Sequence, residues 1–187
     1  MKNLIVCLLV ILVSISCREA KKVDYEIYDG PDVTLRDIDM LVSDSTIVKL
    51  RLQAKTQLEL ASGDREFPDG IFLQFYNDLG QLSSTLVAKS GYYFSKEDYY
   101  QAEGDVVMES IINGDELSTE RLLWTPAAER IHTDNFVTIK SEDEVLTGEG
   151  LEASQNFEEY TILNPSGTMA VARQSQPAVT QSPVINE

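Results

Sequence analysis

The sequence predicts an all-β domain, an antiparallel β-jellyroll or twisted open sandwich, and two observations lead to this fold class. Apolar and polar residues alternate from Val48 to Leu60, and a helix would scatter the same apolar residues around its axis. Short apolar segments then recur between turn-forming residues at intervals of about ten residues, which is typical of sandwiches, rolls and open barrels. The alternation of strands with helices that marks nucleotide-binding α/β folds does not occur along the sequence.

The alternating run is the first strand that we expect. Its inward face is predicted to carry Val48, Leu50, Leu52, Ala54, Thr56, Leu58 and Leu60. Further strands are expected at residues 71–76, 82–88, 91–94, 99–102, 105–112, 117–124, 130–133, 136–140, 145–151 and 160–163. A single helical turn is expected near residues 152–159.

The first residues carry signals for export and anchoring. Lys2 precedes an unbroken apolar run at residues 4–13, about half the length that a membrane-spanning helix needs, so we expect a signal peptide. Residues 14–17 (SISC) resemble the lipobox of bacterial lipoproteins, in which the cysteine is diacylated, although Ser14 stands where leucine is commonest. A lipidated Cys17 would hold the chain at a membrane, because two or more acyl chains bind firmly. The alternative is an ordinary signal peptide with an incidental cysteine.

Composition divides the chain into four parts and limits its partners. We expect a signal peptide at 1–16, a lipidated N-terminus and tether at 17–32, a β-domain at 33–168 and a disordered tail, rich in Gln, Ser and Pro, at 169–187. Removing Lys2 with the signal peptide changes the formal net charge from −16 to −17. Such an acidic surface excludes electrostatic binding to nucleic acid or to anionic headgroups.

The residues offer little catalytic chemistry. Cys7 would be removed and Cys17 lipidated, so the mature chain keeps no thiol for a disulfide, a nucleophile or a Cys-based zinc site. His132 is the only histidine, and on a predicted strand end it is expected to face solvent. With 31 Asp and Glu residues, carboxylate pairs at a glycosidase-like separation arise by chance. We expect no catalytic residue, no metal site, no cofactor and no enzyme activity.

Aromatic residues gather in one stretch of the predicted domain. They are Tyr92, Tyr93, Phe94, Tyr99 and Tyr100. On an exposed rim they could stack on sugars or meet lipid, whereas within a sheet they would pack across strands, which we favour. Trp124 follows Leu122 on the same face of its strand and is expected in the core.

Short segments with glycine and aromatic residues follow one another in a specific order along the predicted domain. They are residues 88–93 (AKSGYY), 102–107 (AEGDVV), 117–124 (LSTERLLW), 131–134 (IHTD) with Val137 and Ile139, 148–151 (GEGL) and 165–167 (PSG). Their order and spacing resemble the LptC family of periplasmic lipopolysaccharide-export proteins. The resemblance covers roughly Asp32 to Thr168, which is nearly all of the predicted domain.

The resemblance implies a function and a set of partners. LptC-like proteins are jellyrolls that bind lipopolysaccharide in an apolar groove and relay it from an inner-membrane ABC transporter to the bridge protein LptA, for outer-membrane assembly. LptA-like jellyrolls join them by pairing of edge strands. The resemblance therefore implies a location in the periplasm at the inner membrane. Many relatives have an N-terminal transmembrane helix where this chain has Cys17, so no function of that helix is carried over.

The predicted alternation supplies the candidates for contact with acyl chains. They are Leu50, Leu52, Ala54, Ile71, Leu73, Phe75, Leu86, Val106, Met108, Leu122, Trp124, Val137 and Ile139. Each of them could equally belong to a closed core.

Two other functions are weighed beside the relay. An LptA-like bridge unit would need no lipid anchor. A structural or carbohydrate-binding β-sandwich lipoprotein would carry an exposed aromatic platform and no apolar groove.

Overall fold

The structure is a computed structural model that describes residues 30–170. The chain separates into two units, Met1–Gly30 and Pro31–Glu187, and the fold lies in the second. The predicted signal peptide, Cys17 and nearly all of the tether lie outside the described residues, as do residues 171–187 of the predicted tail. Within residues 30–170, no helix has the length and apolar character that crossing a membrane requires.

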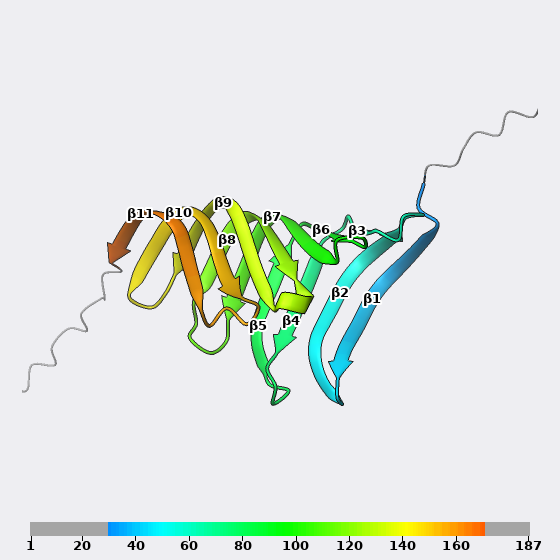
Figure 1. Cartoon of the computed structure of the whole chain (residues 1–187), viewed down its shortest axis with the longest axis horizontal. Coiled ribbons are helices and arrows are strands. Elements are labelled where there is room, and N and C mark those ends of the chain that lie inside the picture. The colour runs from blue at the N-terminus through cyan, green and yellow to red at the C-terminus, as the bar shows by residue number, and fades with distance from the viewer. Residues whose placement is uncertain (1–29, 171–187) are drawn as a thin grey trace, which may run out of the picture. The chain divides into compact units, whose positions relative to one another are not determined.

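One antiparallel sheet of 11 strands makes up the described part of the chain (Figure 1). The strands are β1 (Val33–Asp44), β2 (Ile47–Glu59), β3 (Arg65–Phe67), β4 (Ile71–Tyr76), β5 (Leu82–Ala88), β6 (Ser90–Phe94), β7 (Tyr99–Ser110), β8 (Glu116–Thr125), β9 (Arg130–Lys140), β10 (Glu144–Ser154) and β11 (Tyr160–Ala170). A short 3-10 helix, η1 (Pro126–Ala128), joins β8 to β9. The predicted all-β fold class is confirmed.

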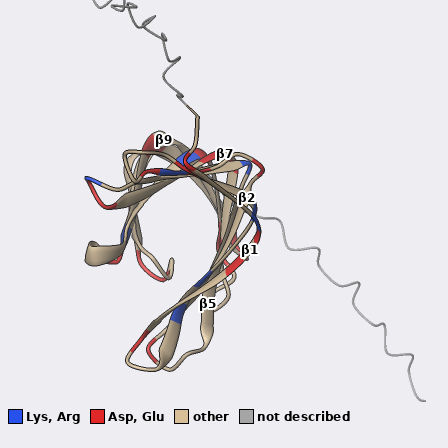
Figure 2. Ribbon diagram, turned by 90° about the vertical axis from the view of Figure 1, so that its right-hand side faces the viewer, with Lys and Arg blue, Asp and Glu red and all other residues tan. Residues whose placement is uncertain are grey.

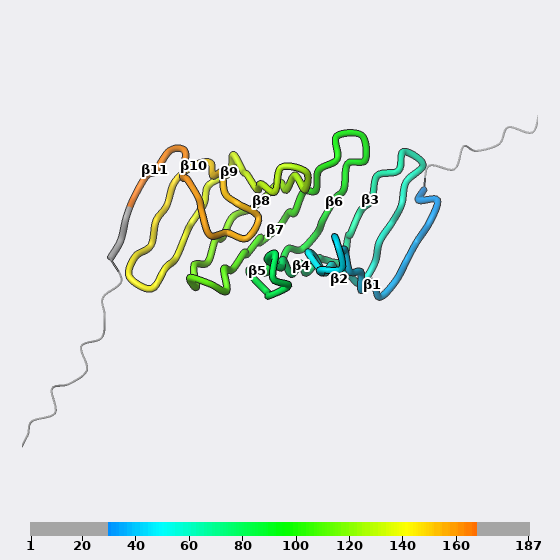
Figure 3. The backbone as a smooth tube through the Cα atoms, turned by 60° about the horizontal axis from the view of Figure 1, so that its bottom comes forward, coloured from blue at the N-terminus to red at the C-terminus, as the bar shows by residue number. Residues whose placement is uncertain are grey.

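The sheet divides between β2 and β7. The second half of β7 pairs with β5, and its first half pairs with β6. Similarly, residues 50–54 of β2 pair with β4, and residues 58–59 pair with β3. Two walls result, with β4 and β5 in the first wall and β3 and β6 in the second (Figure 3). At the two ends of the sheet, β1 pairs only with β2 and β11 only with β10.

Strands β7 to β10 pass from one wall into the other at a shared bend. Each strand pairing shifts register there, at Gly104 and Asp105 in β7, between Thr119 and Leu123 in β8 and at Gly150 in β10. Gly104, Asp105 and Gly150 have positive φ angles of 77°, 45° and 78°, which fits β-bulges. Figure 2 shows the strands wrapped into an incomplete ring as a result.

The core fills the space between the two walls. Along β4, residues at positions 71, 73 and 75 are buried while their neighbours are half-exposed, as period two requires. The buried apolar residues are Leu50, Leu52, Ala54, Phe67, Ile71, Leu73, Phe75, Leu86, Ala88, Ala102, Val106, Met108, Leu117, Leu122, Trp124, Ile131, Val137, Ile139, Leu151, Ala153 and Phe157.

The structure corrects several expected elements. The helical turn predicted near residues 152–159 is wrong, because β10 continues to Ser154 and a turn follows. The segments predicted as separate strands at 99–102 and 105–112 form the single strand β7, and those at 130–133 and 136–140 form β9. Strands β1 and β3 were not predicted. In β2 the inward face changes phase after Ala54, so that Gln57 is buried instead of Thr56 and Leu58.

Candidate functional site

The thirteen residues predicted to contact acyl chains all lie in the buried core. None is more than 9% exposed. Leu122 and Trp124 come from the second wall, and the others come from β2 or the first wall. The candidates therefore share one interior. Sequence reasoning missed most of the second-wall side of it, including Phe67, Ile131 and Leu151.

This interior is closely packed. A wholly apolar cavity lies between Leu52, Leu73, Leu86 and Leu122, and its volume is only about 20 Å³. That space is enough for about one water molecule and is far too small for an acyl chain. An acyl chain can lie in this part of the interior only when the two walls move apart or a core side chain leaves its place.

Aromatic rings connect the two walls inside the sheet. Phe75 of β4 meets Trp124 of β8 edge-on, with ring centroids 5.2 Å apart. Tyr100 lies 5.0 Å from Trp124 and 4.5 Å from Tyr93. Burial raises the pKa of Tyr100. Tyr93, Tyr100 and Trp124 thus pack in a row, as the sequence favoured, and Tyr100 and Trp124 border the opening of the interior. Tyr92, Phe94 and Tyr99 are half-exposed on the other face of the sheet, where Phe94 lies 6.5 Å from Tyr92 and 4.7 Å from Tyr99.

The opening between the walls lies opposite the bend, and we call it the mouth. It holds about 460 Å³ and is lined by Val42, Asp44, Lys49, Leu50, Phe75, Asp78, Asp98, Tyr100, Trp124, Pro126, Glu129 and Gln155. Leu50, Phe75 and Trp124 are buried core residues, so an apolar floor lies beneath a charged rim.

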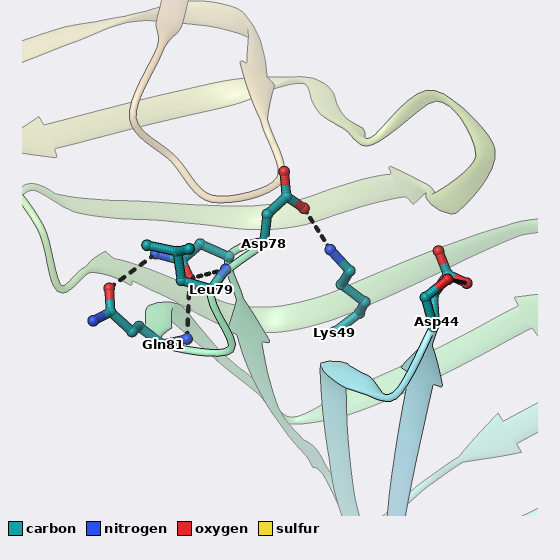
Figure 4. Close-up of polar contacts among 7 residues, drawn as sticks. Asp44, Lys49, Asp78, Leu79 and Gln81 are labelled. Atoms are coloured by element: carbon teal, nitrogen blue, oxygen red, sulfur yellow. Dashed lines mark hydrogen bonds and ion pairs between the residues drawn. The ribbon is translucent and has the colours of Figure 1, made fainter.

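Carboxylates dominate the rim of the mouth. Lys49 makes an ion pair with Asp78 of the β4–β5 turn, and Asp44 lies at the tip of the β1–β2 hairpin on the other side of Lys49 (Figure 4). The hydrogen bond to Asp78 raises the pKa of Lys49, and the charges of Asp44 and Glu129 add to this effect. The same bond lowers the pKa of Asp78. The rim therefore repels anions, and its lysine is already paired with a carboxylate.

The turn between β10 and β11 lies at the edge of the mouth and is hydrogen-bonded to both walls. We call residues 155–159 the closing turn. The Gln155 N–H donates to the Glu129 carbonyl (3.0 Å), the Ser84 hydroxyl donates to the Gln155 carbonyl (3.1 Å), and the Trp124 indole N–H donates to Gln155 Oε1 (3.1 Å). Phe157 is fully buried and stacks on Tyr160, with centroids 5.1 Å apart. No pattern of residues indicated Gln155 or Phe157, which lie outside the alternating segments.

The two end strands leave backbone groups unpaired. On β1, the side chains of Val33, Leu35, Leu41 and Val42 are exposed. On β11, Leu163 is 48% exposed. Gly148 lets β11 approach β10 closely, because a Cβ there would lie 2.4 Å from Ile162 Cγ2. An unpaired strand edge is a template for a strand of another chain.

Residues considered for other chemistry do not form a site. His132 faces solvent on β9, as expected. Within the described residues, no group of three or more His, Cys, Asp or Glu side chains is placed to hold a metal ion.

Comparison with known proteins identifies the family. The family model for lipopolysaccharide-assembly, LptC-related proteins matches residues 4–170. A comparison with curated proteins gives no match. The family consists of transport components that are periplasmic and associated with the inner membrane, and it is not an enzyme family. The chain therefore belongs to the LptC family and has a function in lipopolysaccharide transport.

Proposed function

We propose that the chain binds lipopolysaccharide by its acyl chains between the two walls and relays it from an inner-membrane ABC transporter to an LptA-like periplasmic jellyroll. One observation carries this proposal. An apolar interior, lined by strands β2 to β10, opens on one side of a sheet whose two end strands each leave their outer edge unpaired. A relay unit needs both features, because cargo must enter from the side and the groove must continue into a neighbour.

Recognition through the acyl chains follows from the charges at the mouth. Asp44, Asp78, Asp98 and Glu129 surround the opening, and Lys49 is paired with Asp78. Phosphate groups gain no attraction from such a rim, whereas acyl chains gain free energy from contact with Leu50, Phe75 and Trp124. The sugar and phosphate part of the cargo would stay in water outside the rim.

Strand pairing at the ends of the sheet is the proposed joint. Backbone N–H and C=O groups provide the affinity when a strand adds to an edge, so the joint places few demands on side chains. We assign β11 to the LptA-like partner. An aromatic sugar-binding platform is the weaker alternative, because Tyr100 and Trp124 pack against each other at the mouth and the half-exposed rings of Phe94 and Tyr99 stack on each other.

Lipid on Cys17 is the proposed anchor. The segment from Cys17 to β1 has about 15 residues, which gives a flexible chain a reach of roughly 20 Å. That reach allows the jellyroll to dock on a transporter in the same membrane. It is far too short to carry the domain across the periplasm.

Photo-crosslinking at neighbouring residues tests the groove. Leu86 and Val87 follow one another on β5, and their side chains are 2% and 49% exposed, on opposite faces of the sheet. A photoreactive residue at Leu86 should capture lipopolysaccharide in cells, and one at Val87 should not. Equal capture at both positions would contradict binding between the walls.

A further inference from the structure

The closing turn is the only described segment that hydrogen-bonds across the mouth through its own backbone and side chain together. Its Gln155 is held by Ser84 from the first wall and by Trp124 and Glu129 from the second. These are three separate contacts, whereas the bend on the opposite side consists of continuous strands. Opening the molecule at the mouth therefore requires the loss of few hydrogen bonds. Opening it at the bend would require the loss of backbone hydrogen bonds between the strands of the sheet.

Phe157 occupies the interior in an unusual way. Its ring is fully buried in the core cluster, although the residue belongs to a turn. Its φ angle is +54°, in the left-handed region that non-glycine residues rarely adopt and at a cost in free energy. Burial of the ring offsets this cost. The conformation of the turn therefore depends on the ring keeping its place between the walls.

The closing turn also borders the open part of the mouth. A hollow of about 190 Å³ runs from Lys49 and Asp78 to Gln155 and Asn156. A lipid entering at the mouth would thus meet the closing turn directly. The cavity between the walls beyond the mouth holds only about 20 Å³, so a chain that passes the mouth needs the walls to move apart or a buried residue to leave its place.

We propose that Phe157 is a plug for the groove, and that an acyl chain of the cargo takes its place when the closing turn swings away from Ser84 and Trp124. This inference rests on the proposed function and adds to it a closed state of the empty protein. The ring keeps the apolar interior out of water until cargo arrives, and the cargo then supplies the apolar contact that the ring gives up.

The plug is linked to the edge where the partner is proposed to bind. Phe157 stacks on Tyr160, which is the first residue of β11. When Phe157 leaves, Tyr160 loses a stacking partner at the start of that edge strand. The start of β11, at Tyr160, would therefore differ between the loaded and the empty states, and a strand that pairs with β11 would meet this difference.

The single tryptophan of the chain makes the plug measurable. Trp124 is the only Trp residue, and its indole donates to Gln155. With the full chain, addition of purified lipopolysaccharide should change the Trp124 emission maximum, and deacylated lipopolysaccharide should not. Hydrogen exchange of residues 155–157 should become faster on binding in the wild-type protein. This measurement uses no substitution, so it does not depend on whether a variant folds.

Substitutions in the closing turn complete the test. Phe157→Ala and Gln155→Ala should bind lipopolysaccharide roughly tenfold more tightly, because the closed state no longer competes with cargo. Glu158→Ala is the control, since Glu158 is exposed in the same turn. Binding that leaves Trp124 emission and exchange at 155–157 unchanged, with equal affinity for all variants, would overturn the plug and leave the relay intact. Absence of binding to any of these proteins would overturn the proposed function itself.

Discussion

The Thr133 hydroxyl donates a hydrogen bond of 2.5 Å to the Arg121 carbonyl oxygen, and its oxygen accepts one of 3.1 Å from the Asn135 N–H. Thr133 lies on β9 and Arg121 on β8, where the pairing between these strands is interrupted from Thr119 to Leu123. A buried side chain thus pairs backbone groups that the interrupted ladder leaves without partners. The bend is held by such hydroxyls, and Thr119 makes a similar bond of 2.9 Å to the Phe136 carbonyl.

Replacing this hydroxyl should destabilise the fold. Thr133→Val keeps the shape of the side chain but leaves two backbone groups unpaired at a site that is 1% exposed. Unsatisfied buried groups cost about 1–3 kcal/mol each, so for the two groups together we expect a loss of at least about 2 kcal/mol in the free energy of unfolding, measured by urea denaturation. Thr138→Val, on the same strand but facing outward, should have little effect. Equal effects of the two substitutions would show that the bend does not depend on Thr133.

Asp64 should make stability depend on pH in acid. Its carboxylate accepts hydrogen bonds from the Ser95 N–H (2.8 Å), the Ser95 hydroxyl (2.9 Å) and the Ser62 hydroxyl (2.7 Å), and these bonds lower its pKa below 3.8, that of the Ser95 N–H most. Because the folded-state pKa is depressed, the stabilisation is present above pH 3.8 and is lost as the pH falls through the folded-state pKa.

The Asp64→Asn variant tests this dependence. Its urea midpoint should be below that of the wild type at pH 7, and the two midpoints should converge in strong acid. Glu97→Gln, in the exposed turn between β6 and β7, serves as the control and should follow the wild type at both pH values. A constant difference between wild type and Asp64→Asn across this range would exclude the Asp64 carboxylate as the cause.

Proline at neighbouring positions of β11 should separate folding from partner binding. In an antiparallel strand, successive N–H groups point to opposite sides. Of the backbone N–H groups of Ile162 and Leu163, one therefore points toward β10 and the other points outward, to the unpaired edge. Proline at the outward position should abolish binding to a purified LptA-like protein without changing the urea midpoint, because the lost donor is unpaired in the monomer. Proline at the inward position should lower the midpoint as well. If both folded variants bind as the wild type does, β11 is not the joint.

Cys17 should be the site of lipid attachment. In cells fed a clickable palmitate analogue, the wild-type chain should be labelled and sediment with membranes, and Cys17→Ser should lose the label. Cys7→Ser is the matched control, because it removes the other cysteine of the chain. Labelling that survives Cys17→Ser would rule out this anchor.

Strand positions were predictable wherever alternation was regular and one face was buried. Residues 71–76 and 82–88 were predicted with the bounds that the structure has, because Ile71, Leu73, Phe75 and Leu86 all face the core. β1 escaped prediction since most of its side chains, Val33, Leu35, Leu41 and Val42 among them, are exposed. Asp37 also interrupts its pattern with a φ angle of +51°. An edge strand with few buried residues leaves no periodic pattern to recognise.

The bend and the closing turn could not be predicted from the sequence, and the reasons differ. Gly104, Asp105, Asp134 and Asn135 are typical turn residues, so the segments before and after them were predicted as separate strands, whereas the structure uses them where one strand crosses between walls. Phe157 is surrounded by polar residues in sequence, and only the structure reveals that its ring is buried in the core. The interior itself was predicted from alternation, which left open whether these residues line a groove or a closed core.

The shared bend has a consequence for any chain that joins the sheet. β11 has an irregularity of its own close to this bend, because its pairing with β10 shifts register between Thr147 and Gly148, where Gly148 lies opposite Pro165. A partner strand that pairs along the whole of β11 must break its own register at the same level, or it will lose contact with one of the two walls. The edge of β11 therefore favours a partner strand that has a register shift at the same level. Such a partner would extend the sheet of both walls. Geometry of the backbone, rather than any side chain, would then keep successive jellyrolls in line.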